Sequence, residues 1–227
     1  MRIALIGNGK TGGQIQHLYP ADLITVFNTS NPVTVEKLKQ NDVAIAFVPG
    51  EILEGLLPTI IESKILLVSG ATGFQWTDEL KNKIKTVNLK WISGSNFSLG
   101  MRVVHQMIQK LNFIKNLFED YQFSIHEIHH TKKLDAPSGT AISWNNWIEN
   151  SANITHERIG DVVGDHTLTF DSEFETIRLQ HVAKDRKIFA QGALWAAKYL
   201  YQNHDKLSPG LHLFETITEK LINSKEK

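Results

Sequence analysis

Short apolar runs alternate with amphipathic segments along about the first 95 residues of the chain. Apolar runs of this length are typical of buried parallel strands, and the spacing between them is that of amphipathic helices. We expect strands at 3–6, 23–27, 43–48, 65–68 and 86–92, and helices at 13–18, 33–38, 52–61 and 76–84. A regular strand–helix alternation predicts an α/β domain built on a parallel sheet.

The pattern changes after Gly100. A single long amphipathic helix is expected over 101–117, and its apolar stripe is interpreted as core: Val103, Val104, Met107, Ile108 and Leu111. Further strands are expected at 121–128, 159–170 and 175–182, with helices at 141–148 and 188–201 and a final return at 211–214 and around 221. Period-2 alternation in the later strands predicts a mostly antiparallel sheet with one face packed on helices.

The two patterns predict two domains. Residues 1–98, with a return segment at 192–227, are expected to form a dinucleotide-binding domain, and residues 99–191 an α+β domain for substrate binding and oligomerisation. The charged end, 225–227, is expected to be a solvated tail.

A glycine-rich turn follows the first expected strand directly. The turn has the form G-x-G-x-x-G and consists of Gly7, Asn8, Gly9, Lys10, Thr11 and Gly12. Placed between a strand and a helix, it lets the backbone approach a pyrophosphate, which then lies at the helix N-terminus. The first domain is therefore predicted to be of the Rossmann type and to bind NADH or NADPH through these residues.

The end of the second strand leaves the choice of cofactor open. A nicotinamide-binding domain usually has an Asp or Glu there for the ribose hydroxyl, but this chain has Asn28. An amide can bond a hydroxyl and does not repel a 2′-phosphate, for which Lys10 is the nearest cation. Asn28 is a candidate cofactor contact, with an ordinary turn residue as the alternative.

Composition excludes several other classes of protein. The 227 residues carry a formal net charge of +0, so no basic surface favours nucleic acid or anionic lipid. There is no Cys, which excludes disulfides, thiolate catalysis and cysteine-ligated metals. No apolar run approaches the roughly 20 residues of a membrane span, and the first run is too short for a signal peptide. We expect a cytoplasmic protein without a metal or a membrane partner.

The segment after the strand at 121–128 gathers protonatable groups ahead of a helix start. It contains His129, His130 and Lys133, and it ends in a Pro-Ser-Gly-Thr turn in which Ser138 or Thr140 is the expected helix cap. A helix N-terminus offers free N–H groups to an anion. Together these residues predict a pocket for a small carboxylate with a proton donor beside it, rather than an ordinary capped surface loop.

The same segment carries a family resemblance. From Glu127 to Ala141 it reads Glu-x-His-His-x-x-Lys-x-Asp-Ala-Pro-Ser-Gly-Thr-Ala, which resembles the signature of 4-hydroxy-tetrahydrodipicolinate reductases of the lysine and diaminopimelate pathway. The segment 160–167 is similar to the family as well, and the resemblance extends over nearly the whole chain. It implies NADH- or NADPH-dependent reduction of a cyclic imine dicarboxylate with overall loss of water.

The resemblance also implies roles for the loop residues. Lys133 is expected to be the proton donor and His129 an acid or base beside it, so both are candidate catalytic residues. His130 is expected to help bind one substrate carboxylate, and the backbone of Gly139 and Thr140 with the Thr140 hydroxyl the other.

Two further loops resemble cofactor-binding loops of the family. The stretch 70–73 matches a Gly-Thr-Thr-Gly loop with one Thr replaced by Ala, and 93–98 is similar to an Asn-Phe-Ser turn. The cofactor contacts implied by these loops are Gly70, Ala71, Thr72, Gly94, Ser95, Asn96 and Phe97.

The remaining expectations concern polar residues outside these groups. His166 is interpreted as structural because it lies in mid-strand, Asp165 as a counter-charge for a neighbouring base, and Asp135 as ordering its loop through backbone N–H groups. Arg186 stands near a family arginine of the substrate cleft, and the family sheet implies a homotetramer.

Two other functions compete with this interpretation. Another two-domain NAD(P)-dependent dehydrogenase explains the first 100 residues equally well but not the His-His loop. A non-catalytic dinucleotide-sensing protein predicts a loop without protonatable groups. Under the favoured interpretation, the glycine turn and the 129–140 segment face each other across one cleft.

Overall fold

The computed structural model describes residues 1–149 and 151–224, so the expected tail at 225–227 lies outside the described residues. The chain forms two compact units. Unit 1 contains Met1–Ser98 and the segment from Lys187 onward, and unit 2 contains Leu99–Arg186. Assignment of cofactor binding to unit 1, and of substrate binding and oligomerisation to unit 2, stays a prediction.

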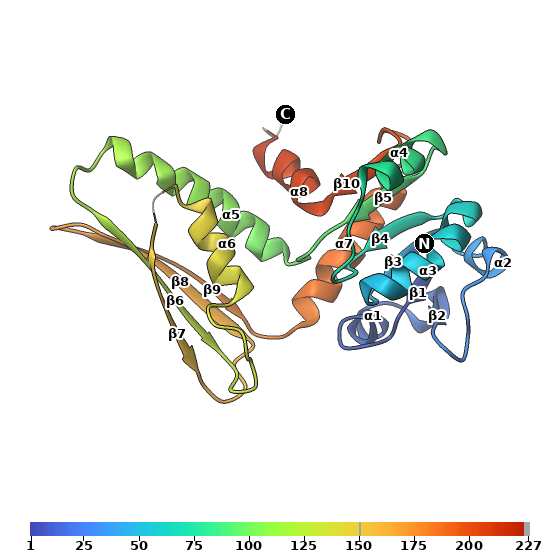
Figure 1. The fold of residues 1–227 in the computed structure, drawn as a ribbon, viewed down its shortest axis with the longest axis horizontal. Helices are drawn as coiled ribbons and strands as arrows, with labels where there is room; N and C mark the ends of the chain where they lie inside the picture. Colours follow the sequence, from blue (N-terminus) through green and yellow to red (C-terminus); the bar gives the residue numbers. More distant parts are fainter. Residues whose placement is uncertain (150, 225–227) are drawn as a thin grey trace. The chain divides into compact units, whose positions relative to one another are not determined.

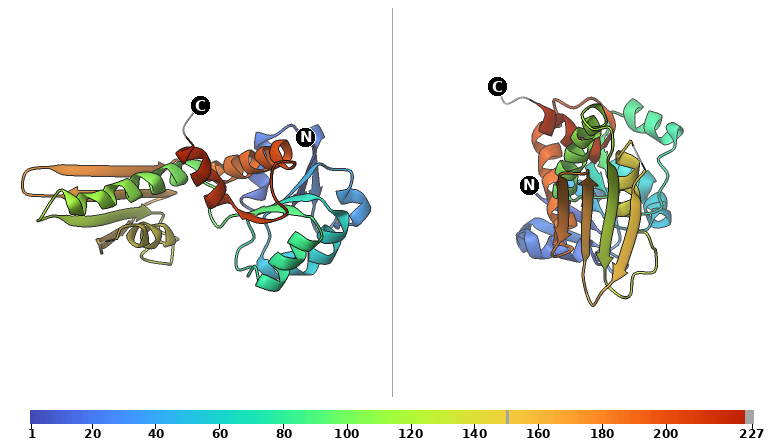
Figure 2. Two further views of the ribbon diagram at one scale, coloured as in Figure 1. Left: turned by 90° about the horizontal axis from the view of Figure 1, so that it is seen from above. Right: turned by 90° about the vertical axis from the view of Figure 1, so that its left-hand side faces the viewer.

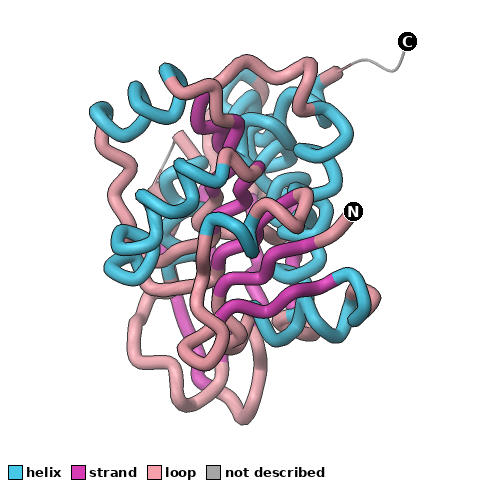
Figure 3. The backbone as a smooth tube through the Cα atoms, turned by 90° about the vertical axis from the view of Figure 1, so that its right-hand side faces the viewer, coloured by secondary structure: helices cyan, strands magenta, loops and turns pink. Residues whose placement is uncertain are grey.

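Unit 1 is built on a parallel sheet of strand order β10-β5-β4-β3-β1-β2 (Figures 1 and 3). Its strands are β1 (Ile3–Ile6), β2 (Ile24–Phe27), β3 (Val43–Ala46), β4 (Leu66–Ser69), β5 (Lys90–Ser93) and β10 (Gly210–Leu213). All residues of β1 and β3 are buried, as expected for central strands covered on both faces. The strand order reverses between β1 and β3, and ligands of open α/β sheets bind at the carboxyl ends of the strands at such a point.

Helices cover both faces of this sheet (Figure 2). They are α1 (Gly12–Leu18), α2 (Val35–Leu38), α3 (Gly50–Ser63), α4 (Asp78–Thr86), α7 (Lys187–Asn203) and α8 (Phe214–Asn223), with a 3₁₀ turn, η1 (Ala21–Leu23). Leu53 and Ile60 of α3 and Ile84 of α4 share a core cluster with the sheet residues Ala4 and Ala44. The small-residue side of α7 packs on β3, β4 and β5 and is fully buried at Ala190, Ala193, Ala196 and Ala197.

Two expected elements of unit 1 are shorter than the sequence pattern indicated. The helix expected at 33–38 begins only at Val35, because Thr34 is its N-cap and accepts a bond from the backbone of Lys37. The strand expected at 86–92 begins at Lys90, since α4 continues to Thr86. Apolar content alone does not separate the last turn of a helix from the start of the next strand.

Unit 2 is a mixed sheet of order β7-β6-β8-β9 with helices on one face (Figures 1 and 2). Its elements are α5 (Leu99–Leu111), a 3₁₀ turn η2 (Asn112–Asn116), β6 (Gln122–His129), α6 (Gly139–Trp147), β7 (Asn153–Arg158), β8 (Gly164–Asp171) and β9 (Thr176–Ala183). β6–β8 and β8–β9 are antiparallel, and β6–β7 is parallel. Alternate residues of β6 and β8, among them Ile125, Leu168 and Phe170, are buried with Trp144 of α6. This confirms the expected α/β fold with a second, mostly antiparallel domain.

Three expectations for unit 2 were wrong in detail. The long helix at 101–117 ends at Leu111 and continues as 3₁₀ turn. Its stripe is only partly core, because Val103 is 44% and Met107 49% exposed. The strand expected at 159–170 begins only at Gly164, because a turn with Gly160 at a φ of +46° precedes it; β7, which ends at Arg158, was not expected.

Candidate active site

The carboxyl edge of the unit 1 sheet carries every residue expected to contact the cofactor. The glycine turn follows β1, Asn28 follows β2, the loop 70–72 follows β4 and the loop 94–97 follows β5. These strands are neighbours in one parallel sheet through β3, so their ends lie along the same edge. An isolated bridge between Pro49 and Thr72 links the loop after β3 to the loop after β4.

The glycine turn has the shape that a dinucleotide pyrophosphate needs. Gly7 has a φ of +88°, and a Cβ there would lie 2.5 Å from the carbonyl oxygen of Phe47. A Cβ on Gly12 would lie 2.0 Å from the carbonyl oxygen of Gly7. Both glycines are therefore required by the fold itself. A Cβ on Gly9 would meet no protein atom within 4 Å, so this position leaves the open space into which a phosphate group fits.

A cavity of about 320 Å³ lies at the carboxyl ends of β4, β5 and β10. Its lining includes the expected cofactor residues Ala71, Gly94 and Ser95, with Trp76 and Glu215 beside them. A larger cavity of about 530 Å³ between α3 and α4 contains none of the expected cofactor residues. The smaller cavity is therefore the better match for one end of an elongated dinucleotide.

Two of the expected cofactor contacts have structural roles in unit 1. The side-chain oxygen of Asn28 accepts bonds from the backbone N–H groups of Ser30 and Asn31, which leaves its amide NH₂ as a donor. Phe97 is only 2% exposed and packs against Phe47 and Phe214, so its ring belongs to the core.

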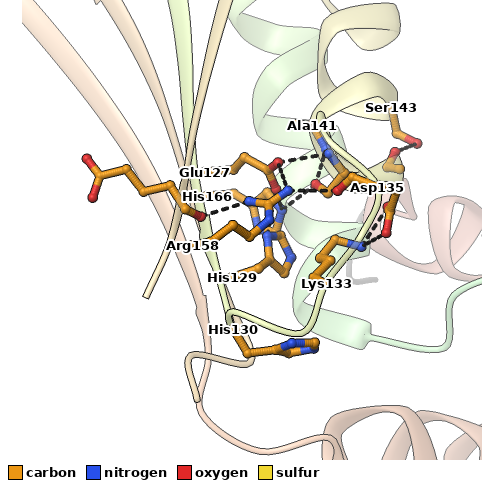
Figure 4. Close-up of polar contacts among 12 residues, drawn as sticks. Glu127, His129, His130, Lys133, Asp135, Ala141, Ser143, Arg158 and His166 are labelled. Atoms are coloured by element: carbon orange, nitrogen blue, oxygen red, sulfur yellow. Dashed lines mark hydrogen bonds and ion pairs between the residues drawn. The ribbon is translucent and has the colours of Figure 1, made fainter. Parts of the chain in front are cut away.

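The catalytic-loop candidates lie in unit 2 between the end of β6 and the start of α6 (Figure 4). Ser138 is the N-cap of α6, as expected, and its hydroxyl accepts a bond from the N–H of Ala141. The exposed Gly139 and the half-buried Thr140 are the first two helical residues, whose N–H groups have no acceptor within the helix. No acidic residue occupies this first turn, so the helix start suits a carboxylate.

A fully buried carboxylate lies behind the loop. Glu127 of β6 is 0% exposed. Its Oε1 accepts bonds from the N–H of Ser138 at 2.9 Å and from Nη2 of Arg158 at 3.2 Å, and its Oε2 lies 2.6 Å from Nδ1 of His129. Burial raises the pKa of Glu127, but bonds from Ser138 and Arg158 outweigh burial and hold this pKa below its ordinary value. Glu127 is therefore ionised.

His129 is held against this carboxylate. Its Nδ1 lies 2.6 Å from Oε2 of Glu127, a contact that is an ion pair when the imidazole is protonated. Burial lowers the pKa of His129, the charge of Glu127 raises it, and the charges of Lys133 and Arg158 lower it, with a net value below the ordinary one. His129 is 7% exposed, so little of the ring reaches solvent.

His166 lies directly opposite Glu127 on the neighbouring strand β8. Its Nε2 is 3.2 Å from the hydroxyl of Ser138 and 3.8 Å from Oε2 of Glu127. Burial, reinforced by the neighbouring His129, lowers the pKa of His166 to about 4, so the ring is neutral at physiological pH. His166 lies in mid-strand and is part of the group around Glu127, and its interpretation as a structural residue stays a prediction.

Lys133 and Asp135 form a local pair on the loop. The Lys133 Nζ lies 2.7 and 2.6 Å from the two carboxylate oxygens of Asp135. The bond from Lys133 is the main cause that lowers the pKa of Asp135. The expectation that Asp135 orders the loop through backbone N–H groups was incomplete, because its carboxylate is bonded mainly to the ammonium group of Lys133.

His130 and Arg186 lie apart from the buried group. Nη2 of Arg186 is 3.1 Å from Nε2 of His130 (Figure 4 shows the separate position of His130). The two residues are 56 positions apart in the chain and bring a second cationic group to the end of the loop. Asp165, expected to neutralise a base, accepts bonds from Gln180 and raises the pKa of His181.

Glu127, His129 and His166 present potential metal ligands whose atoms all lie within 4.8 Å of one another. Two ligands of one zinc ion, each at about 2.0–2.2 Å, stand more than about 3 Å apart in tetrahedral geometry. The 2.6 Å contact between Glu127 and His129 is shorter than this, and the Arg158 guanidinium bonds the same carboxylate. The arrangement is that of a carboxylate in close contact with an imidazole and bonded to a guanidinium group.

Sequence reasoning missed the roles of Glu127 and Arg158. The signal for Glu127 was the period-2 pattern of β6, in which Phe123, Ile125, Glu127 and His129 all face the buried side. Arg158 left no such signal, because β7 is mostly exposed and was not expected as a strand.

Comparisons with known proteins agree in pointing to one family. Residues 100–213 match the family model described as dihydrodipicolinate reductase, C-terminus. The 4-hydroxy-tetrahydrodipicolinate reductase of Christiangramia forsetii is 35% identical over 222 residues, covering 88% of this chain and 92% of the relative. That of Thermosipho africanus is 30% identical over 226 residues, covering 97% and 99%.

A solved structure shares the fold. Dipicolinate-bound dihydrodipicolinate reductase from Paenisporosarcina sp. TG-14 superposes with a TM-score of 0.74 at 20% identity, covering 96% of this chain and 99% of that one.

Among the described residues, none of the helices has the length and apolar character required to cross a membrane.

Proposed function

Because this chain belongs to the 4-hydroxy-tetrahydrodipicolinate reductase family, we propose that unit 1 binds its nicotinamide cofactor and that the loop after β6 binds and protonates its cyclic substrate. The chain is an oxidoreductase of lysine biosynthesis that reduces 4-hydroxy-tetrahydrodipicolinate to tetrahydrodipicolinate. One hydride and one proton are taken up, and the hydroxyl group leaves as water. The observation that carries the site assignment is the buried Glu127–His129 pair directly behind the loop.

The substrate has two carboxylates, and the loop offers two places for them. The exposed start of α6, with the N–H groups of Gly139 and Thr140 and the Thr140 hydroxyl, suits one carboxylate because its dipole and free donors favour an anion. His130, paired with Arg186, suits the other, since a guanidinium beside an imidazole supplies charge and donors together.

Proton delivery is assigned to Lys133 with His129. Lys133 holds three N–H donors in a partly buried position, and Asp135 keeps its ammonium group on the loop. His129 is placed to exchange a proton, because its Nδ1 lies 2.6 Å from the Glu127 carboxylate, while burial and the charges of Lys133 and Arg158 hold its pKa below the ordinary value. A proton from Lys133 reaches the ring nitrogen as negative charge develops there, and His129 takes up a proton from solvent and passes it to the neutral amine of Lys133.

The residues of unit 1 fit a dinucleotide. Its pyrophosphate would lie over Gly9 at the start of α1, and its other end in the cavity lined by Ala71, Gly94 and Ser95. When bound, the cofactor supplies the hydride. We propose that NADH and NADPH are both used, because no carboxylate follows β2 to repel a 2′-phosphate and the Asn28 amide remains a donor.

We also propose a homotetramer in the cytoplasm. Both helices of unit 2 lie on one face of its sheet, and among the described residues of that unit none covers the other face (Figure 2). Thr167, Thr169 and Arg178 point toward this uncovered face, as their alternation with the buried residues of β8 and β9 indicates. Sedimentation equilibrium measures the mass directly, and a monomer would contradict this assignment.

Steady-state kinetics test the function. The purified protein is given 4-hydroxy-tetrahydrodipicolinate with NADH or NADPH in parallel, and a generic keto acid serves as the control substrate. We expect cofactor oxidation only with the cyclic substrate and kcat/KM values for the two cofactors within about tenfold, a difference of about 1.4 kcal/mol. Equal rates with the keto acid would favour a general dehydrogenase, and no oxidation at all would favour a dinucleotide-sensing protein.

A further inference from the structure

Glu127 is an unusual residue to find in the interior of a sheet. Its side chain is 0% exposed, yet it remains ionised. Burying a carboxylate is costly unless it is paired and bonded, and an apolar residue of similar volume often stabilises a fold equally well. The charge of Glu127 therefore calls for a purpose other than filling space.

The two carboxylate oxygens of Glu127 have different partners. Oε1 links β6 to the start of α6 and to β7, because it accepts hydrogen bonds from the N–H of Ser138 at the helix cap and from Arg158 on β7. Arg158 also donates to the carbonyl oxygen of Asp135 at 2.7 Å, so the same guanidinium ties the loop to the sheet. Oε2 is left to face the imidazoles of His129 and His166.

Hydrogen bonds to Oε1 therefore fix the position of the carboxylate, and Oε2 remains close to the imidazole of His129. We propose that Glu127 is a positioning residue for the reduction, which holds the His129 ring in place and stabilises its protonated form, and that Arg158 and Ser138 hold Glu127 for that purpose. The proposal rests on the assignment of His129 as a proton-exchanging group. Glu127 touches neither substrate nor cofactor in this account and acts only through His129.

The charged and titratable groups around His129 come from four elements. They are Glu127 on β6, Lys133 on the loop, Arg158 on β7 and His166 on β8. Glu127 raises the pKa of His129, whereas Lys133 and Arg158 lower it. Removal of the charge of Glu127 must therefore lower the pKa of His129, which a purely structural role for Glu127 does not predict.

The test uses Glu127→Gln, which keeps the shape of the side chain and removes its charge. Glu119→Gln is the matched control, because Glu119 is an exposed glutamate of the same unit. The pKa of His129 is followed by NMR on ¹⁵N-histidine-labelled protein, and its signal is identified by its loss in His129→Gln. We expect the pKa of His129 to fall in Glu127→Gln and to be unchanged in Glu119→Gln.

This titration needs no enzyme activity, so it separates the proposal from the proposed function. An unshifted His129 pKa in Glu127→Gln overturns the proposal even if the protein is an active reductase. Glu127→Asp keeps the charge and withdraws it from His129 by one methylene group, so it remains a test if Glu127→Gln does not fold. In that case an unshifted His129 pKa in Glu127→Asp overturns the proposal.

Kinetics provide the second readout. We expect Glu127→Gln to lower kcat by about 10- to 100-fold, part of the 10²–10⁴-fold that a positioned acid or base supplies. In a His129→Gln background the same change should cause no further loss, because residues that act as a unit are not additive. An equal loss in both backgrounds would mean that Glu127 acts independently of His129, and would overturn the proposal.

Discussion

At the scale of single residues, two histidines face one carboxylate and differ in what they can do. His129 is in contact with Glu127 at 2.6 Å, and His166 is 3.8 Å from the same oxygen. Because an opposite charge stabilises an imidazolium more strongly at the shorter distance, His129 is the better proton carrier. His166, deeply buried beside Trp144, stays neutral and orients the group through Ser138.

Replacement of Lys133 by Ala should lower kcat by on the order of 10²-fold or more, the typical contribution of a positioned acid. Lys132→Ala is the matched control, since Lys132 is the exposed neighbour on the same loop. The measurement is steady-state reduction at saturating cofactor. A Lys133→Ala enzyme with the turnover of the control would remove Lys133 from the mechanism.

The neutral His166 should make the stability of the protein depend on pH. Its folded pKa of about 4 is below its ordinary value of 6.5, so the unfolded chain binds the extra proton between these values. Stability should therefore be greatest above pH 6.5 and decrease as pH falls toward 4, with a contribution on the order of 3 kcal/mol from this group. Burial lowers the pKa values of His129 and His181 as well, which adds in the same direction.

Urea unfolding at pH 7.5 and at pH 4.5 measures this dependence. His166→Gln should lose a substantial part of the pH dependence, whereas His156→Gln, which replaces an exposed histidine of β7, should retain it. If His166→Gln and the wild-type protein show the same loss of stability between the two pH values, the buried ring is not the cause.

At the scale of elements, two glycines of the turn between β1 and α1 differ in how closely the surrounding chain packs against them. A Cβ on Gly12 would be 2.0 Å from a backbone oxygen, which cannot move without distorting the turn. A Cβ on Gly9 meets no protein atom. Gly12 is thus required by the fold, whereas packing places no such demand on Gly9, where we propose that the pyrophosphate binds.

Gly12→Ala should lower the thermal stability of unit 1, by more than the roughly 1 kcal/mol typical of single substitutions. Gly9→Val should melt close to the wild-type temperature and lose most of its affinity for NADH, because the side chain fills the space reserved for the pyrophosphate. Calorimetry gives both the melting temperature and the affinity. Unchanged NADH affinity in Gly9→Val would place the pyrophosphate elsewhere.

The elements also show how far the sequence could predict this molecule. The strands of unit 1 were found because buried parallel strands are continuous apolar runs, as in β1 and β3. β7 was missed because it is mostly exposed and has no such run. The break after α5 was missed because apolar residues three apart, such as Leu111 and Ile114, suit a 3₁₀ turn as well as an α-helix.

The candidate site was predicted in part for the same physical reasons. The loop residues lie close together in sequence, so His129, Lys133 and the cap at Ser138 were visible as one group. Arg158 reaches Glu127 from 31 positions away, through strand pairing that no local pattern reveals. The buried carboxylate behind the loop was therefore not anticipated, although its place in the alternation of β6 was available.

At the scale of the whole molecule, we propose that the two units contribute different parts of one active site. Unit 1 carries the glycine turn and the loops after β4 and β5, and unit 2 carries the protonatable loop and the start of α6. Hydride transfer requires donor and acceptor atoms about 3–3.5 Å apart. The prediction that the two sites face each other across one cleft is therefore a requirement of the activity, and direct transfer tests it.

The most direct measurement is the mass of the product formed with NADH that carries deuterium at both C4 positions. We predict that tetrahydrodipicolinate made by the wild-type protein contains one deuterium per molecule, and that Gly9→Val and Lys133→Ala form this labelled product much more slowly. Tetrahydrodipicolinate without deuterium, or consumption of NADH without formation of this product, would contradict the account.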